Sequence, residues 1–185
     1  KAVAAAESLN ALTGKQNVAG MDSRAGVLAA EIVVLTVPFS AQKPTVEELQ
    51  DALKGKILID VTVPLVPPKV SMVQLPETDS CVVAIQKLLG DQTKVVSAFQ
   101  NVSAHKLKEL SYRIDCDVLV ASDDVEARQV GIELANEAGL RGVDVGVLAN
   151  SVVAESLTSV LISINRKYKI PDAGIRITGL PAYTA

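Results

Sequence analysis

The chain has 185 residues, of which 49% are hydrophobic, 21% charged and only 3% aromatic, and its formal net charge is −3. This length favours one domain, or one domain with a small second lobe, and the apolar content excludes a disordered chain. The net charge predicts no basic surface for nucleic acid, and no unbroken run of about 18 apolar residues suggests a membrane span. Without tryptophan, the core has to be built from Ala, Val, Leu and Ile, which is typical of a parallel sheet covered on both faces.

The cysteines and the N-terminal residues bear on the cellular compartment. Cys81 and Cys116 form no Cys-x-x-Cys motif and the chain has one histidine, so a zinc site is not expected. Two isolated cysteines in an aliphatic chain predict buried thiols in a reducing cytoplasm. Glu7 interrupts the apolar start of the chain, so no targeting segment is expected there.

Apolar, strand-like runs alternate with helix-like segments along the chain, which predicts an α/β fold with a mostly parallel sheet. In chain order, the predicted elements are a helix over 1–12 closed by Gly14, a short helix over 23–30 capped by Asp22, a strand over 32–37, a helix opened by Pro44 and reaching 53, a strand over 56–61, a surface loop over 65–79, a helix over 80–89, strands over 94–99 and 117–122, a helix from 123 to 138 with a capping box at Asp123 and Glu126, a short strand over 141–146 and a helix over 150–168. The last helix is predicted to bury Val153, Leu157, Val160, Leu161 and Ile164.

Three predicted strand ends share a hydroxyl or amide group followed by an apolar wall: Thr36–Phe39, Thr62–Leu65 and Ala98–Ala104. In an open parallel sheet, ligands bind at the carboxyl ends of the strands. An apolar cleft with few polar groups suits a flat ring. One Val-Pro pair is explained by a proline that ends a strand, but two Thr-Val-Pro copies on consecutive strands favour a binding role.

Residues for acid–base or nucleophilic catalysis are few, and none is assigned a catalytic role. For His105, a solvated or capping position is favoured, because no carboxylate nearby in sequence orients it. Asp123 and Asp124 are best explained by helix capping. Glu155 is either a salt-bridge or surface residue or one that shapes a pocket or an interface. No glycine-rich phosphate loop is found, since Gly139–Gly142 lacks the required spacing and precedes a strand.

Several motifs together give the chain a family resemblance that covers essentially all of its length. They are Leu35–Pro38, Ile59–Pro64, Val95–Phe99 with Val102–Ala104, Asp115–Asp117 with Ser122 and Asp123, Asp144–Ser151 with Glu155, and Ala173–Thr178. With these motifs the chain resembles the NADPH-dependent reductases of the deazaflavin coenzyme F420. The resemblance implies a Rossmann-like, doubly wound fold and hydride transfer between NADP(H) and coenzyme F420, with the cofactors supplying the chemistry and no metal. The apolar last helix would suit the interface of a homodimer.

Members of that family carry a strand, a glycine-rich loop and a helix before a Lys-Ala pair that Lys1–Ala2 resembles. We therefore expect this chain to begin after the first βαβ unit, which leaves the strand over 32–37 without a neighbour. The expected division is an NADP-binding domain over 1–145 and, over 146–185, a helix and extended tail that complete the deazaflavin pocket. Without the loop, only Lys1 supports NADP over NAD.

The resemblance also implies positions for the binding residues. Lys1 would lie near the 2′-phosphate, and Ala98–Ala104 would form the wall where the two rings stack. The implied binding residues are Lys1, Thr36, Val37, Pro38, Phe39, Thr62, Val63, Pro64, Ala98, Phe99, Val102, Ala104, Leu148, Asn150 and Leu180. Four basic residues have two possible roles: Arg166, Lys167, Lys169 and Arg176. They either bind the anionic tail of the deazaflavin or interact favourably with the dipole at the C-terminal end of the last helix.

Two other functions stay open at this point. One is a related NADP-dependent reductase with another acceptor, such as a flavin, ferric ion or an imine. The other is a protein without catalytic activity that binds a nucleotide or a partner.

Overall fold

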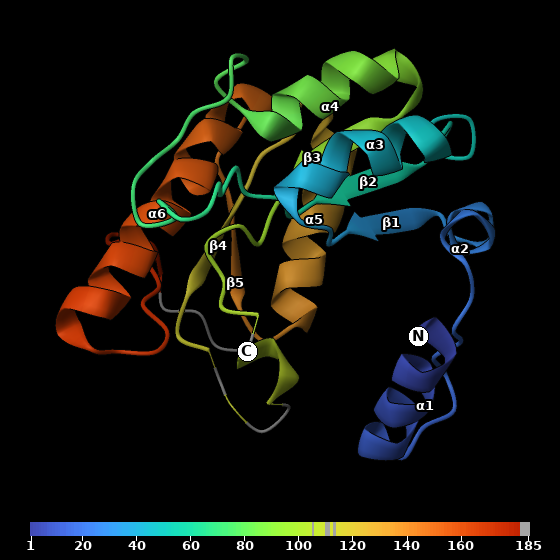
Figure 1. Ribbon diagram of the computed structural model, residues 1–185, viewed down its shortest axis with the longest axis horizontal. Coiled ribbons are helices and arrows are strands. Elements are labelled where there is room, and N and C mark those ends of the chain that lie inside the picture. The colour runs from blue at the N-terminus through green and yellow to red at the C-terminus, as the bar shows by residue number, and fades with distance from the viewer. Residues whose placement is uncertain (105, 110–111, 113, 182–185) are drawn as a thin grey trace.

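The computed structural model describes residues 1–104, 106–109, 112 and 114–181, so His105 lies outside the described residues (Figure 1). In chain order its elements are α1 Ala2–Thr13, α2 Ser23–Ala29, β1 Ile32–Leu35, α3 Phe39–Leu49, β2 Ile57–Asp60, α4 Cys81–Leu89, η1 Gly90–Gln92, β3 Lys94–Ser97, η2 Lys106–Lys108, β4 Asp117–Val120, α5 Val125–Glu137, β5 Arg141–Asp144, η3 Leu148–Asn150 and α6 Ser151–Tyr168.

Several helix ends lie where capping chemistry predicts them. Gly14 follows α1 with φ of 68°, a left-handed conformation that glycine adopts at little cost. The side chain of Asp22 accepts a hydrogen bond from the backbone N–H of Ala25 at the start of α2. Ser80 accepts one from Val83 in the same way at the start of α4. These boundaries confirm the sequence prediction.

Two predicted helix starts are wrong. The third helix begins at Phe39, directly after the extended Pro38, and Pro44 lies inside it instead of opening it. Proline at that position removes one backbone donor, and α3 forms despite that loss. At α5, Asp124 and not Asp123 is the cap, because its Oδ1 accepts a hydrogen bond from the Ala127 N–H at 2.8 Å. Asp123 is therefore free to bind another element.

The strands form two parallel groups. One is β1–β2–β3, in which β2 is central, and the other is β4–β5. Ser97 and Ala121 join the groups through an antiparallel bridge of two backbone hydrogen bonds of 2.8 and 3.0 Å. In Figure 1 the arrows of β4 and β5 run across the direction of the first three strands. The sheet is mostly parallel, as predicted, but changes direction at this bridge.

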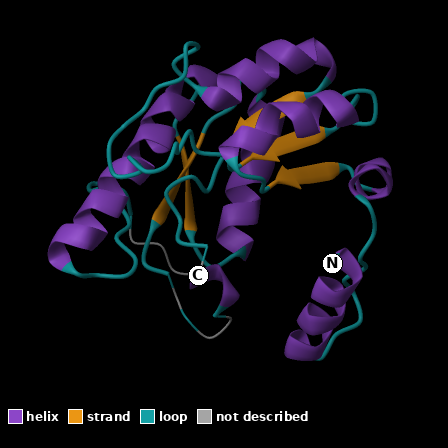
Figure 2. Cartoon of the chain, in the orientation of Figure 1, coloured by secondary structure: helices purple, strands orange, loops and turns teal. Residues whose placement is uncertain are grey.

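Helices cover both faces of the central strands (Figure 2). Leu58 and Val95 belong to an apolar cluster with α3 and α4. Their neighbours Ile59 and Val96 point to the opposite face and belong to a second cluster, with α5. Adjacent strand residues therefore face separate cores, which explains why these strands lack polar alternation. The doubly covered α/β fold is confirmed.

The first strand differs from the prediction of a strand buried on both faces. Among the described strands, β1 pairs only with β2. Ile32 and Val34 are 44% and 42% exposed, and only Leu35 is buried. An edge position among the described strands explains this exposure.

The long C-terminal helix α6 also buries a different stripe from the one predicted. Val153 and Val160 are exposed, whereas Leu161 is buried as expected. The buried residues are small or polar: Ser151, Ala154, Glu155 and Ser159, with Leu161. The segment Leu148–Tyr168 is long and apolar enough to cross a membrane, but core helices of soluble proteins pass the same test of length and composition.

Candidate functional site

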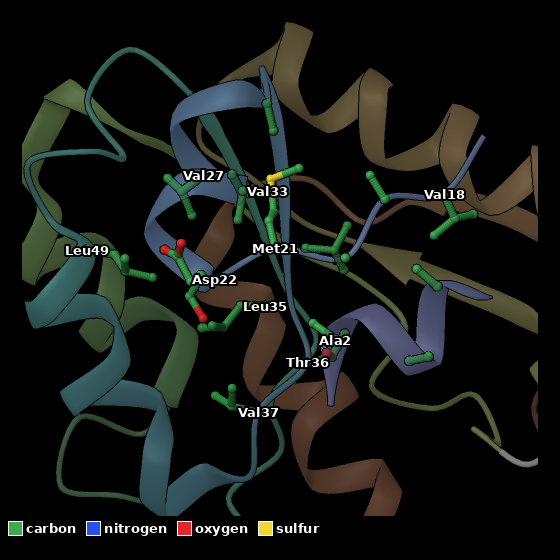
Figure 3. A pocket seen from close by; sticks show the side chains of 18 of the residues that line it. Ala2, Val18, Met21, Asp22, Val27, Val33, Leu35, Thr36, Val37 and Leu49 are labelled. Atoms are coloured by element: carbon green, nitrogen blue, oxygen red, sulfur yellow. The ribbon is translucent and has the colours of Figure 1, made fainter. Parts of the chain in front are cut away.

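A cavity of about 560 Å³ lies between α1, α2 and the exposed side of β1 (Figure 3). Its wall is mainly apolar and includes Val18, Met21 and Val27. Thr36 and Val37, both predicted to bind the nicotinamide nucleotide, line it at the end of β1. Lys1 is exposed and lies at the N-cap position of α1, while its neighbour Ala2 is part of the wall.

The backbone at Gly20 holds α1 against this cavity. A Cβ atom built on Gly20 would lie 2.4 Å from the backbone N and Cα of Val3. Real Cβ atoms do not approach backbone atoms so closely, so only glycine allows this contact. Asn10 completes the attachment, because its side chain donates to the Val18 carbonyl and accepts from the Val18 N–H.

Phe39 lies in a different cavity from Thr36 and Val37. This second cavity, of about 660 Å³, lies between α3 and α4 and is lined by apolar residues together with Gln42, Lys43 and Lys87. The turn from Pro38 into α3 carries Phe39 away from the first cavity. The structure therefore separates residues that the Thr-Val-Pro-Phe motif places next to each other in sequence.

A buried polar cluster forms at the end of β2. The Asp60 carboxylate, which is fully buried, accepts a hydrogen bond from the Thr62 N–H at 2.9 Å and one from the Gln42 amide at 2.6 Å. Burial raises the pKa of the Asp60 carboxyl, and the nearby Glu155 charge adds to the rise, although its hydrogen bonds oppose it. The hydrogen bond from the Thr62 N–H to Asp60 fixes the position of Thr62. Thr62 and Pro64 are buried, and Val63 is half-buried.

Glu155 of α6 binds the start of α4. Its carboxylate, 1% exposed, accepts hydrogen bonds from the Ser80 hydroxyl at 2.6 Å and from the Cys81 N–H at 2.9 Å. Ser151 joins this group through a 2.7 Å bond to Ser80. Glu155 is thus not a surface residue, and it forms no salt bridge with any residue that the structure describes. Burial, together with the Glu155 and Asp60 charges, raises the pKa of the Cys81 thiol and keeps it protonated.

The loop after β3 contains the predicted ring wall. Ala98 is fully buried, Phe99 and Val102 are half-buried, and Ala104 is exposed. Phe99 has φ of 70°, which is unusual for a residue other than glycine. The Gln100 amide donates to the Asp60 carbonyl at 2.8 Å and so attaches this loop to β2. The sequence prediction of a third strand reaching 99 is therefore wrong at its end.

Among the described residues, four buried polar atoms in or near this loop have no hydrogen-bond partner: Thr62 Oγ1, Ser97 Oγ, Gln100 Oε1 and Asn101 Oδ1. A buried polar atom without a partner costs about 1–3 kcal/mol. Groups that donate hydrogen bonds, such as the amide of a nicotinamide ring, would satisfy them. Together with the apolar surface of Phe99 and Val102, these atoms fit a flat ring that carries polar substituents.

Leu148 and Asn150 follow β5. The Leu148 N–H donates to the Asp123 carboxylate at 2.9 Å, which is the role that Asp123 has instead of capping α5. Leu148 is 1% exposed and belongs to the apolar cluster with α3 and α4. Asn150 is exposed and donates to the Val145 carbonyl.

The C-terminal tail contains the remaining predicted residues. Leu180 is 43% exposed. Arg176 makes ion pairs with Asp115 and Asp117 at 3.0 and 2.9 Å, whereas Arg166 donates to the Ser71 hydroxyl. The contacts of Arg176 are therefore to carboxylates of the chain itself. Burial of Asp117 would raise its pKa, but hydrogen bonds from Arg141, the Ile177 N–H and Arg176 outweigh this and lower the pKa of Asp117.

Comparison with known proteins settles the family. Residues 1–64 match the profile described as NADP oxidoreductase, coenzyme F420-dependent. The F420-dependent NADP reductase of Methanocaldococcus jannaschii is 38% identical over 168 residues, which are 89% of this chain and 75% of that protein. The enzyme of the same name from Methanothermobacter marburgensis is 38% identical over 98% of this chain and 84% of its own length. The chain belongs to the family of F420-dependent NADP reductases.

Solved structures agree on the fold. One from Arthrobacter sp. FB24, provisionally described as an F420-dependent NADP-reductase, has a TM-score of 0.71 at 23% identity and covers 82% of this chain and 71% of that one. An imine reductase from Bacillus cereus has a TM-score of 0.54 at 11% identity and covers 89% of this chain and 51% of that one. At these identities the likeness concerns the Rossmann-like fold alone.

Several residues that build the site in this reductase are not among those that the sequence predicts. Asp60 could have been found, because an Asp two residues before a Thr at a strand end is a common turn signal. Gln42, Gln100 and Asn101 could not, since their partners are 15 to 40 residues away in sequence. The pairing of Asp117 with Arg141 and Arg176 is equally invisible without the fold.

Proposed function

We propose that the chain catalyses hydride transfer between NADP(H) and coenzyme F420. The observation that carries this proposal is the 38% identity to F420-dependent NADP reductases over most of the chain. The apolar strand ends and the scarcity of acid–base groups fit a reaction in which two ligands exchange a hydride. In that reaction, the nicotinamide and the deazaflavin supply the chemistry, and a hydride passes between C4 of one ring and C5 of the other.

On the nicotinamide side, Thr36, Val37 and Pro38 would contact the nucleotide beside the 560 Å³ cavity. Thr62, Val63 and Pro64 would extend this surface at the next strand, where the turn at Asp60 keeps Thr62 in place. Phe39 faces the α3–α4 cavity and would act only at the edge of this surface. Lys1 is exposed and would provide the charge for the 2′-phosphate, which favours NADP over NAD.

On the deazaflavin side, Ala98, Phe99, Val102 and Ala104 would form the wall between the rings. Their task is to orient the rings and to exclude water, because hydride transfer requires close, aligned contact. Leu148, Asn150 and the tail that ends at Leu180 would complete the pocket. The division into an NADP-binding part over 1–145 and a deazaflavin-completing part over 146–185 belongs to this proposal.

The assembly and compartment are also proposals. The exposed Val153 and Val160 on α6 support a homodimer, because they leave an apolar face on a long helix. Cys81 and Cys116 are buried free thiols, which suits a reducing cytoplasm. The net charge of −3 favours small-molecule ligands over nucleic acid, and we propose no membrane association.

The test is an assay with NADPH and oxidised coenzyme F420, followed by the visible absorbance of the deazaflavin. We expect that absorbance to fall, with no turnover of a flavin, ferric citrate or a cyclic imine. Turnover with one of these acceptors but not with coenzyme F420 would replace the proposed acceptor. Binding of NADPH without turnover of any acceptor would favour a protein that binds nucleotide without catalysis.

A matched pair of variants tests the ring wall. Val102→Ala removes two methyl groups from the proposed wall, and we expect about fivefold lower kcat/KM for coenzyme F420. Val83→Ala makes the same change at another half-buried valine, which lies in α4 and packs against the apolar core. This variant should leave kcat/KM unchanged. Equal losses in both variants would argue against the placement of the wall.

A further inference from the structure

Asp117, the first residue of β4, carries a charge in a fully buried position. Arg141 donates to both of its carboxylate oxygens, with the Nε to Oδ1 distance at 2.8 Å. Arg176 donates to Oδ1 at 2.9 Å. Buried charges persist only when they are paired and hydrogen-bonded, so this cluster compensates a carboxylate that would otherwise be costly.

The same cluster fixes the C-terminal tail, whose described residues, 170–181, form no helix or strand. The Asp117 N–H donates to the Ile175 carbonyl at 2.8 Å, and the Ile177 N–H donates to Asp117 Oδ2 at 2.6 Å. Arg141 adds hydrogen bonds to the carbonyls of Ile177 and Pro181, of 3.2 and 2.8 Å. The tail is therefore attached to Asp117 and Arg141 at four of its residues, Ile175, Arg176, Ile177 and Pro181.

Asp117 also holds the loop after β3. The Asn101 amide, 3% exposed, donates to the Asp117 carbonyl at 2.7 Å and contacts the Cys116 sulfur at 3.3 Å. On its other side, Cys116 packs against Gly174, where an added Cβ would lie 2.9 Å from the sulfur. The segment Cys116–Asp117 thus lies between the Ala98–Ala104 loop and the tail, in contact with both.

We infer that Asp117, with Arg141 and Arg176, positions the two segments that enclose the deazaflavin, and that it sets affinity for coenzyme F420 and not for NADPH. This inference rests on the proposed function, which assigns both the loop and the tail to the deazaflavin side. None of the three residues is proposed to touch a reacting atom. Asp117 is bonded to Asn101 of the loop and to Ile175 and Ile177 of the tail, and Arg141 donates to carbonyls of the tail. Arg176, itself part of the tail, pairs with the Asp117 carboxylate, so the three residues act through the loop and the tail.

The experiment uses the full chain and three variants of the cluster. Asp117→Asn keeps the size of the side chain and removes its charge. Arg176→Gln removes one partner from a partly exposed position, and Arg176→Lys keeps the charge. The control is Arg24→Gln, which breaks the exposed ion pair of Arg24 with Asp51. For each, KM is measured for coenzyme F420 and for NADPH, and the affinity for coenzyme F420 is read from its fluorescence.

We expect Asp117→Asn and Arg176→Gln to raise KM and Kd for coenzyme F420 by about tenfold, the value of one charge-assisted hydrogen bond, while KM for NADPH stays within about twofold. Hydrogen exchange at the amides of 175–177 should quicken in both. Arg176→Lys should recover most of the affinity, and Arg24→Gln should match the wild type. Because Arg176 is partly exposed, its variants stay informative even if Asp117→Asn does not fold.

Two results would overturn the inference: faster exchange in the tail with unchanged affinity for coenzyme F420, or equal changes in KM for both ligands. Failure of the proposed function gives a different result. A wild-type chain that binds coenzyme F420 but transfers no hydride would refute the function, and the Kd values would still decide the role of Asp117. A wild-type chain that does not bind coenzyme F420 would refute both.

Discussion

The Glu155 carboxylate in α6 accepts a hydrogen bond from the backbone N–H of Cys81, the first residue of α4, at 2.9 Å. A second one from the Ser80 hydroxyl, at 2.6 Å, places this negative charge at the positive end of α4. The contact joins helices that are more than 70 residues apart in sequence. It explains how α6, which buries mainly small residues, stays attached to the sheet domain.

Replacing Glu155 with glutamine should destabilise the fold. In Glu155→Gln one carboxylate oxygen becomes an amide nitrogen, so either the Ser80 hydroxyl, bonded to Oε1, or the Cys81 N–H, bonded to Oε2, loses its acceptor. We expect a loss of about 1–3 kcal/mol in the free energy of unfolding, measured by urea denaturation. Glu133→Gln, at a position on α5 with only a surface contact to Gln129, should change it by less than about 0.5 kcal/mol. Equal stability of the two variants would contradict this role for Glu155.

Asp60→Asn should show the opposite effect, and the effect should depend on pH. Because the pKa of the folded Asp60 is raised, the unfolded chain loses this proton first as the pH rises above about 3.8, so the folded state loses stability until its own pKa is passed. The penalty is complete once the pH exceeds the folded pKa. Asparagine removes it, and Gln42 can turn its amide to suit the new group.

We therefore expect Asp60→Asn to be more stable than the wild type at pH 7, by on the order of 1 kcal/mol. The advantage should shrink as the pH falls from the folded pKa towards about 3.8, and it should be absent below that value. Urea denaturation between pH 3 and pH 8 measures both, with Asp91→Asn, at an exposed position, as the control. A constant difference between variant and wild type at every pH would show that burial of the charge is not the cause.

The sequence predicts the layers of this fold well, because each depends on local patterns. Unbroken apolar runs such as Val118–Val120 identify buried strands, and Asp22, Ser80 and Gly14 mark helix ends through hydrogen bonds or backbone angles within three residues. The prediction of the buried side of α6 from its large apolar residues is wrong, because this helix buries mainly small and polar residues. Val153 was predicted to be buried in α6 and is 58% exposed.

The candidate site is less predictable, because its polar contacts join distant segments. Motifs placed Thr36 and Phe39 together, but the early start of α3 sends them to different cavities. Asp123 illustrates the same limit. Its capping spacing is genuine, yet its neighbour Asp124 caps the helix, and Asp123 instead binds the Leu148 N–H. Local chemistry offers two carboxylates, and only the fold decides which one serves each partner.

Gly20 gives a prediction about the cavity beside β1. In Gly20→Ala the new Cβ would meet the backbone of Val3, so α1 must shift away from the 560 Å³ cavity. If the nucleotide binds there, Kd for NADPH should rise by about tenfold or more, while Kd for coenzyme F420 changes little. Isothermal titration calorimetry measures both values.

Gly26→Ala is the matched control for this change. Gly26 lies in α2 and also lines the cavity, but an added Cβ would make only an ordinary contact, 3.6 Å from the Met21 side chain. Alanine favours a helix over glycine by up to about 1 kcal/mol, so this variant should be slightly more stable and should bind NADPH normally. Normal NADPH binding in Gly20→Ala would count against a nucleotide in this cavity.

The exposed apolar face of α6 leads to a prediction about assembly. Val153 and Val160 are 58% and 43% exposed and seven residues apart, so they lie on the same side of the helix. If this face joins two chains, the double variant Val153→Lys, Val160→Lys places charges opposite each other and should yield monomers. Analytical ultracentrifugation gives the mass of each form.

The control is Val3→Lys with Leu12→Lys, which puts the same charges on exposed apolar positions of α1 and should leave the mass unchanged. A wild-type chain that sediments as a monomer at micromolar concentration would contradict the dimer. A double variant that stays dimeric would place the interface elsewhere.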